Sequence, residues 1–250
     1  MKIVNGPAVP LTAGCASFAT SVAAACCFLT VWSYWYWELD AQCEAGRDCK
    51  CLLFGTSFAS GNFVGGDQYA CSYVYHSTIA SSALAACASV YYGTKWLLCP
   101  DGRLREGRRP VRRSSNQPPA TKSRISSLKI CFVIILILMA LNMFVVSIVI
   151  SNGYISTCRQ YVHQVKQFLM VTGNMERLVS NRLSCGTIYD FMDYLQPPSR
   201  QVTYELIHKH KSNPRDSVIN TSEFLIVSII MSWLNTVIWI IFAALTYYLK

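Results

Sequence analysis

Residues 130–151, with the sequence ICFVIILILMALNMFVVSIVIS, decide the fold of this chain because they contain no charged side chain. Asn142 is the only amide in the run. As an α-helix the run would be roughly 33 Å long, enough to cross the hydrocarbon core of a bilayer. A helix that is apolar on every face suits lipid and not the surface of a soluble protein. The run therefore predicts a transmembrane helix.

Three further apolar runs extend this prediction to a four-span protein. They cover residues 11–37, 69–98 and 224–249, and the third span is taken as 130–152. The whole chain is 52% hydrophobic and only 14% charged, whereas soluble domains carry about 25% charge. We expect an all-α membrane protein with four transmembrane helices and a small disulfide-braced extracellular or lumenal cap. A cleaved signal peptide is the rival interpretation of the first run, whose uncharged length exceeds a normal signal core.

The charge distribution predicts the sidedness of the four spans. The net charge of +9 is concentrated in residues 99–129, which is typical of a cytoplasmic loop and not of a nucleic-acid site. With four spans, the N-terminal residues 1–10 and the C-terminus then both face the cytoplasm. Residues 38–68 and 153–223 form two outer loops. The second outer loop also contains basic residues, but the charge rule weakens in loops longer than about 60 residues. We expect a plasma-membrane or secretory-pathway location.

Cysteines gather in or beside the two predicted outer loops. An even number of cysteines in an oxidising compartment indicates disulfides. We predict that Cys158 pairs with Cys185, which would close a loop worth roughly 3 kcal/mol, and that the first loop has two pairs of its own. The six candidates are Cys43, Cys49, Cys51, Cys71, Cys158 and Cys185, with Cys51 paired to Cys71 and Cys43 to Cys49. Asn220, in the sequence Asn-Thr-Ser, is the glycosylation candidate.

No catalytic, metal-binding or cofactor-binding motif is present in the sequence. The His208-Lys209-His210 triplet is interpreted as solvated and not as a metal site. Ionisable residues are missing from the middle of each span, where pumps and coupled transporters place them. His76 is interpreted as a hydrogen-bonded interfacial residue, and Asn142 and Asn235 as interhelical hydrogen-bonding groups.

Three surfaces are candidates for contacts with other molecules. Small residues at four-residue spacing in the second span (77, 81, 85 and 89) favour close helix packing, with a pore lining as the alternative. Two amphipathic segments in the second outer loop, 161–179 and 188–195, predict short helices with a partner-binding face; the alternative is that these helices pack only on each other and on the membrane surface. Its candidate residues are Phe168, Leu169, Phe191 and Met192. The candidates for binding anionic lipid at the cytoplasmic face are Arg103, Arg105, Arg108, Arg109, Arg112 and Arg113.

Several short motifs resemble one family of four-span proteins, and the cysteines carry most of the likeness. The matching segments are Cys51-Leu52-Leu53-Phe54, Cys71, residues 151–154 with Cys158, Ser184-Cys185 and residues 220–224. On these residues the chain is similar to a divergent member of the transmembrane protein 179 family. It departs from that family in Cys43 and Cys49, in a longer basic connector and in the lack of a C-terminal tail. The resemblance implies a four-span membrane protein with no established enzymatic activity and no assigned catalytic residues.

The expected function is therefore that of a non-enzymatic accessory subunit or organiser that binds other membrane proteins. The alternative is an oligomeric pore-forming protein, which makes a homo-oligomer one possible assembly. Anionic lipids are the second expected partner, and nucleic acid is not expected.

Overall fold

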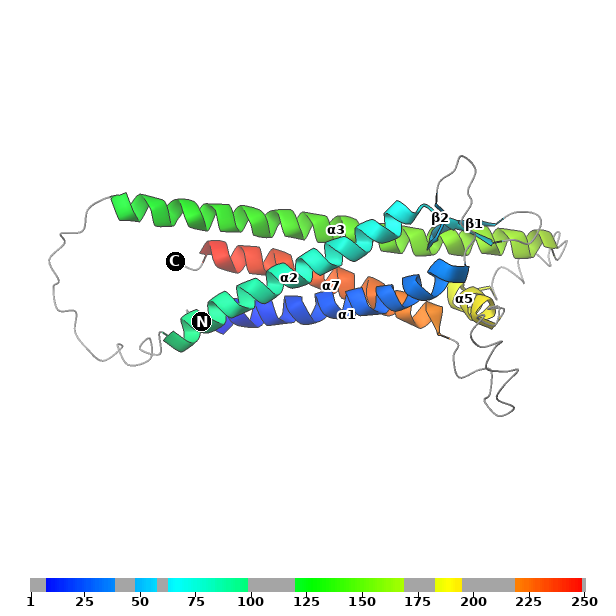
Figure 1. The fold of residues 1–250 in the computed structure, drawn as a ribbon, viewed down its shortest axis with the longest axis horizontal. Coiled ribbons are helices and arrows are strands. Elements are labelled where there is room, and N and C mark those ends of the chain that lie inside the picture. Colours follow the sequence, from blue (N-terminus) through cyan, green and yellow to red (C-terminus); the bar gives the residue numbers. More distant parts are fainter. Residues whose placement is uncertain are drawn as a thin grey trace. The chain divides into compact units, whose positions relative to one another are not determined.

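The computed structural model describes residues 8–38, 48–57, 63–98, 120–168, 183–194 and 219–248, which are mostly helical. Figure 1 shows the order of the elements along the chain. Four helices are long: α1 (Ala8–Glu38), α2 (Gln68–Leu98), α3 (Ala120–Phe168) and α7 (Thr221–Tyr248). The short elements are strands β1 (Cys51–Ser57) and β2 (Phe63–Gly66) and helix α5 (Cys185–Tyr194).

Three of the described helices are long and apolar enough to cross a membrane. The segments are Val9–Tyr36, Ile130–His163 and Thr221–Tyr248. Their length and composition make the chain a multi-pass membrane protein. The fourth predicted span forms α2, which is as long as α1 but does not reach the same hydropathy, because serine, threonine and tyrosine occupy many of its positions.

Helix α3 is much longer than the span predicted within it. It begins at Ala120, inside the segment that was predicted to be a cytoplasmic loop, and it ends at Phe168. Residues 120–129 contain neither proline nor glycine, so the helix of the apolar run can extend toward the N-terminus through that segment without interruption. The periodicity from Tyr161 onward, assigned to a separate cap helix, continues α3 as far as Phe168. A bilayer needs only about 20 helical residues, so α3 extends beyond it.

The expectation of an all-α fold is incomplete because β1 and β2 form an antiparallel hairpin. Their register pairs Cys51 with Gly66 and Ser57 with Phe63, and it shifts between Cys51 and Thr56. The glycines and the irregular register hide the alternation of apolar and polar residues by which strands are recognised.

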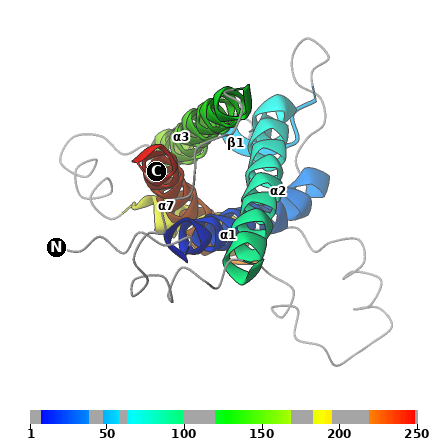
Figure 2. The same cartoon turned by 90° about the vertical axis from the view of Figure 1, so that its left-hand side faces the viewer.

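The described residues divide into two compact units, each containing part of all four long helices. Unit 1 comprises the described residues of Met1–Ala23, Ser77–Val145 and Met231–Lys250, and unit 2 those of Ala24–His76 and Val146–Ile230. Figure 2 views the unit 1 segments of α1, α2, α3 and α7 from their ends. In unit 1, α3 and α7 expose apolar side chains, as expected for surfaces that face lipid: Ile134, Ile137, Leu138, Leu141, Val237 and Ile240.

A buried hydrogen-bond network connects α1, α2 and α7 within unit 1. The Ser81 hydroxyl accepts hydrogen bonds from Trp239 Nε1 at 2.9 Å and Asn235 Nδ2 at 3.1 Å, and lies 2.9 Å from Ser21 Oγ. Because a hydroxyl has one proton and two lone pairs, Ser81 donates to Ser21. Asn235 Oδ1 accepts from Ser17 at 2.9 Å. All five side chains are fully buried. The hydrogen bonds of Asn235 to Ser17 of α1 and Ser81 of α2 confirm the interhelical hydrogen bonding predicted for it.

The small-residue stripe of α2 serves packing within unit 1. Ser81 and Ala85 are fully buried. A Cβ added to Gly14 of α1 would lie 2.8 Å from Ser89 Oγ, so this glycine lets α1 approach α2 closely. The packing interpretation of this stripe therefore agrees with the structure.

Candidate docking surface

The hairpin of unit 2 depends on two glycines in β2. A Cβ added to Gly65 would collide with the Cys49 carbonyl oxygen, and one added to Gly66 would collide with the Leu53 carbonyl oxygen. Only glycine lets the backbones of the two strands lie this close. The chain then turns directly into α2, where the Asp67 carboxylate accepts a hydrogen bond from Tyr69 N at 3.0 Å and caps the helix.

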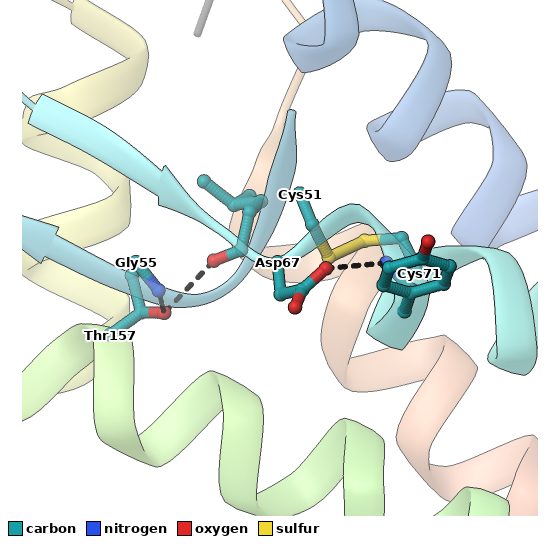
Figure 3. The surroundings of a disulfide bond; sticks show 7 residues. Cys51, Gly55, Asp67, Cys71 and Thr157 are labelled. Carbon is teal, nitrogen blue, oxygen red and sulfur yellow. Dashed lines mark hydrogen bonds between the residues drawn. A yellow bond between two sulfur atoms is a disulfide. The ribbon is translucent and has the colours of Figure 1, made fainter. Parts of the chain in front are cut away.

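A disulfide between Cys51 and Cys71 ties β1 to the first turn of α2 (Figure 3). The two Cα atoms are 5.6 Å apart, and the bond spans 20 residues of sequence. Gln68 N also donates to the Asp48 carbonyl oxygen at 3.1 Å, just before the hairpin. The start of the hairpin and the start of α2 are therefore held together by a covalent bond and a backbone hydrogen bond.

Thr157 of α3 holds the other side of the hairpin (Figure 3). Its hydroxyl accepts a hydrogen bond from Gly55 N at 3.0 Å and donates one to the Leu52 carbonyl oxygen at 2.9 Å. One fully buried side chain thus satisfies two backbone groups of β1. A Cβ added to Gly153 would lie 2.7 Å from Leu53 Cβ, so Gly153 provides the space in which the strand packs against α3.

A second disulfide, between Cys158 and Cys185, joins α3 to α5, with Cα atoms 5.5 Å apart. Beside it, the rings of Tyr154 and Tyr189 stack with centroids 4.8 Å apart, and Tyr189 Oη donates to the Tyr154 carbonyl oxygen at 3.3 Å. Ser184 Oγ caps α5 by accepting from the Thr187 backbone N–H at 3.2 Å. Consecutive residues of α3, Thr157 and Cys158, therefore anchor the hairpin and α5.

The start of α7 is also fixed within unit 2. Asn220 Oδ1 accepts a hydrogen bond from Glu223 N at 3.2 Å and caps the helix. Thr221 is fully buried, and its hydroxyl accepts from Trp35 Nε1 of α1 at 2.9 Å. The glycosylation candidate Asn220 therefore lies at a helix cap in the folded chain.

Phe54 stands at the exposed edge of this scaffold in a rare backbone conformation. Its φ is 60°, in the left-handed region, and its side chain is 37% exposed. A bulky residue in this region costs about 1–3 kcal/mol and persists only where the surroundings impose it. Here the shift in strand register and the hydrogen bond from the next residue, Gly55, to Thr157 impose it.

A mainly polar hollow of about 470 Å³ lies beside Phe54, between β1 and α3. Arg159 is the first charged residue after Lys129, and none of the described residues forms an ion pair with it. We call this region the Phe54–Arg159 surface. It consists of Phe54, Asn152, Ile155, Ser156, Arg159 and Gln160.

The two predicted disulfides whose cysteines are both described, Cys51–Cys71 and Cys158–Cys185, are formed. Several other predicted site residues lie outside the described residues. Cys49 is also disulfide-bonded, but its predicted partner Cys43 lies outside the described residues. So do the side chains of the four predicted partner-binding residues and the whole arginine cluster: Phe168, Leu169, Phe191, Met192, Arg103, Arg105, Arg108, Arg109, Arg112 and Arg113. His76, as expected, is hydrogen-bonded, with its Nδ1 2.7 Å from the Ser72 carbonyl oxygen.

Sequence reasoning did not find the Phe54–Arg159 surface. The position of Arg159, directly after a long uncharged run, is the one signal that the sequence offered. The backbone conformation of Phe54 depends on contacts with α3 that leave no local pattern in the sequence.

Among the described residues, no group of three or more His, Cys, Asp or Glu side chains is placed to hold a metal ion. In the comparisons with known proteins, no family model, curated protein or solved structure matches this chain.

Proposed function

We propose that this chain is a four-span, non-enzymatic accessory subunit or organiser that binds another membrane protein through the Phe54–Arg159 surface. The observation that carries the proposal is the exposed, left-handed Phe54 on a hairpin fixed by a disulfide and by Thr157. Strained residues that a scaffold holds in place cluster at binding sites.

The composition of the surface supports docking to a protein. Binding hot spots are enriched in aromatic residues and arginine and are surrounded by contacts that exclude water. Phe54 and Arg159 have this character, and Ile155 and the neighbouring amides supply the surrounding contacts. Because the scaffold is braced in advance, little backbone ordering opposes binding.

The proposal includes a membrane topology with four spans. α2 has 31 residues, enough to cross a bilayer, and it would bring the hairpin and the Cys158–Cys185 bond to one side. Disulfides there suit the extracellular or lumenal side, and the arginine-rich connector suits the cytoplasm with both termini. We also propose, from the resemblance of the short motifs described above, a divergent place in the transmembrane protein 179 family.

A pore is the competing function, and its lining would have to differ from the small-residue stripe that the sequence suggested. Within unit 1, Ser81 and Ala85 of the small-residue stripe of α2 are fully enclosed, which does not suit a surface that lines an oligomeric channel. Ion flux through liposomes that contain the purified protein would favour the pore and contradict the accessory role.

Site-specific photo-crosslinking in living cells tests the proposed docking. A photoreactive amino acid replaces Ile155, which is exposed and lines the hollow, and in a control it replaces Tyr69, an exposed side chain of unit 2 that does not line it. We expect a discrete protein adduct from position 155 and none from position 69. Phe54→Asn should abolish that adduct, since asparagine tolerates the left-handed backbone but removes the ring. Lipid adducts alone, or equal protein adducts at both positions, would contradict the proposal.

A further inference from the structure

The residues around the hollow indicate what group a partner would place there. We infer that the Phe54–Arg159 surface binds a carboxylate, carried by an aspartate or glutamate side chain of the partner membrane protein. This inference rests on the proposed function and specifies the chemistry of the same site.

Charge and hydrogen-bonding capacity point to an anion with a single charge. Among the described residues that line the hollow, Arg159 alone is charged. Asn152, Ser156 and Gln160 add neutral donors along the same face of α3, and none of the described residues that line the hollow is acidic. A guanidinium presents parallel N–H groups that match the two oxygens of a carboxylate. One carboxylate would therefore neutralise Arg159 and use the neighbouring donors.

The apolar members of the surface favour a carboxylate that is carried on a side chain. Phe54 and Ile155 are exposed and line the same hollow. They offer contacts for the methylene groups of a glutamate or for an apolar neighbour in the partner sequence. By excluding water from the rim, such contacts strengthen the ion pair at the centre.

The distance along α3 distinguishes a protein carboxylate from a lipid phosphate. The uncharged apolar run ends at Ser151, and Arg159 lies eight residues later, which is roughly 12 Å farther along the helix. The headgroup layer adds only about 5–7 Å beyond the hydrocarbon core on each side. Arg159 therefore extends past the lipid phosphates, at the level where a partner's outer domain is accessible.

The test uses the full-length protein with the photoreactive residue at position 155. Arg159→Gln should reduce the yield of the protein adduct about tenfold, because the amide keeps polarity but loses the charge. Arg159→Lys should reduce it less, since an ammonium keeps the charge but not the fork. Size-exclusion chromatography of each variant checks that its fold is retained. An undiminished adduct with Arg159→Gln would overturn the carboxylate inference while leaving the docking proposal in place.

Competition in isolated membranes separates the sources of the anion. We expect N-acetyl-Glu-Phe-amide to suppress the adduct and N-acetyl-Gln-Phe-amide to leave it unchanged. Inorganic phosphate and phosphatidylserine vesicles should compete weakly. Equal competition by both peptides would overturn the role of the carboxylate, and stronger competition by phosphate or by the vesicles would assign the surface to a phosphate group. The absence of a protein adduct from the unsubstituted Arg159 protein would instead contradict the proposed function itself.

Discussion

Single side chains in unit 2 connect segments that are distant in sequence, and Thr157 is the clearest case. Its hydroxyl bonds both Gly55 N and the Leu52 carbonyl oxygen, and all three groups are buried. Without the hydroxyl, both backbone groups would lose their partner in a place that water does not reach. Leaving buried polar groups unsatisfied costs about 1–3 kcal/mol each.

Thr157→Val should therefore loosen the hairpin. The substitution preserves the shape of the side chain but removes both hydrogen bonds, so we expect a loss of stability of about 2 kcal/mol or more. Hydrogen exchange at the Gly55 amide in detergent micelles should accelerate, whereas Thr157→Ser should restore protection. Unchanged exchange in Thr157→Val would show that the hydroxyl does not hold the strand.

The network around Ser81 makes a second prediction for single residues. Ser81→Ala leaves Trp239 Nε1 and Asn235 Nδ2 without their acceptor, whereas the hydroxyl of the neighbouring Ser82 donates to the Ile79 carbonyl oxygen of its own helix. Ser81→Ala should destabilise the chain by about 1 kcal/mol, since hydrogen bonds between helices in membranes are modest. Denaturation by sodium dodecyl sulfate should show this loss and little change for Ser82→Ala. Equal effects would contradict the proposed importance of the network.

For single residues, the sequence predicted disulfide and hydrogen-bond partners better than it predicted backbone conformation. The Cys51–Cys71 and Cys158–Cys185 pairs followed from cysteines that lie in or beside the two predicted outer loops, and the hydrogen bonding of Asn235 followed from its position within an apolar run. Phe54 and Arg159 did not emerge, because their significance depends on β1 lying against α3.

Among the helices and strands, composition predicts those that contain long apolar runs, whereas those that depend on packing were not predicted. The four long helices were predicted because their apolar runs are long. The ends of α3 were not, because residues 120–129 are polar and favour helix only as a continuation of the adjoining run. The hairpin was missed because Gly65 and Gly66 are required by the close approach of the strands, and not by any local periodicity.

The basic connector carries a prediction of its own, although its arginine cluster lies outside the described residues. Six arginines within residues 103–113 should bind anionic lipid, each contributing about 1 kcal/mol near the surface. A connector peptide should bind phosphatidylserine vesicles and not phosphatidylcholine vesicles. Phosphorylation at Ser114 or Ser115 should weaken binding by adding negative charge. Equal binding to both kinds of vesicle would refute this role.

At the scale of the whole molecule, hydropathy established a multi-pass membrane protein, but the span in α2 remains a prediction. Ser81, one of the serines that lower its hydropathy, is buried and hydrogen-bonded to α1 and α7 in unit 1. Composition alone counts Ser81 as polar, whereas the packed helix hides it from lipid. This explains how α2 can be proposed as a span even though it is less apolar than the other long helices.

The central claim is that the disulfide-braced hairpin and the basic connector lie on opposite sides of a membrane that four helices cross. Trypsin treatment of sealed microsomes, cytoplasmic face outward, tests it most directly. We predict cleavage between Arg103 and Lys129 into two fragments that separate without reductant, because Cys51–Cys71 lies in one and Cys158–Cys185 in the other. A connector that trypsin cuts only after detergent opens the vesicles would contradict the topology, and fragments that separate only after reduction would contradict the disulfide pairing.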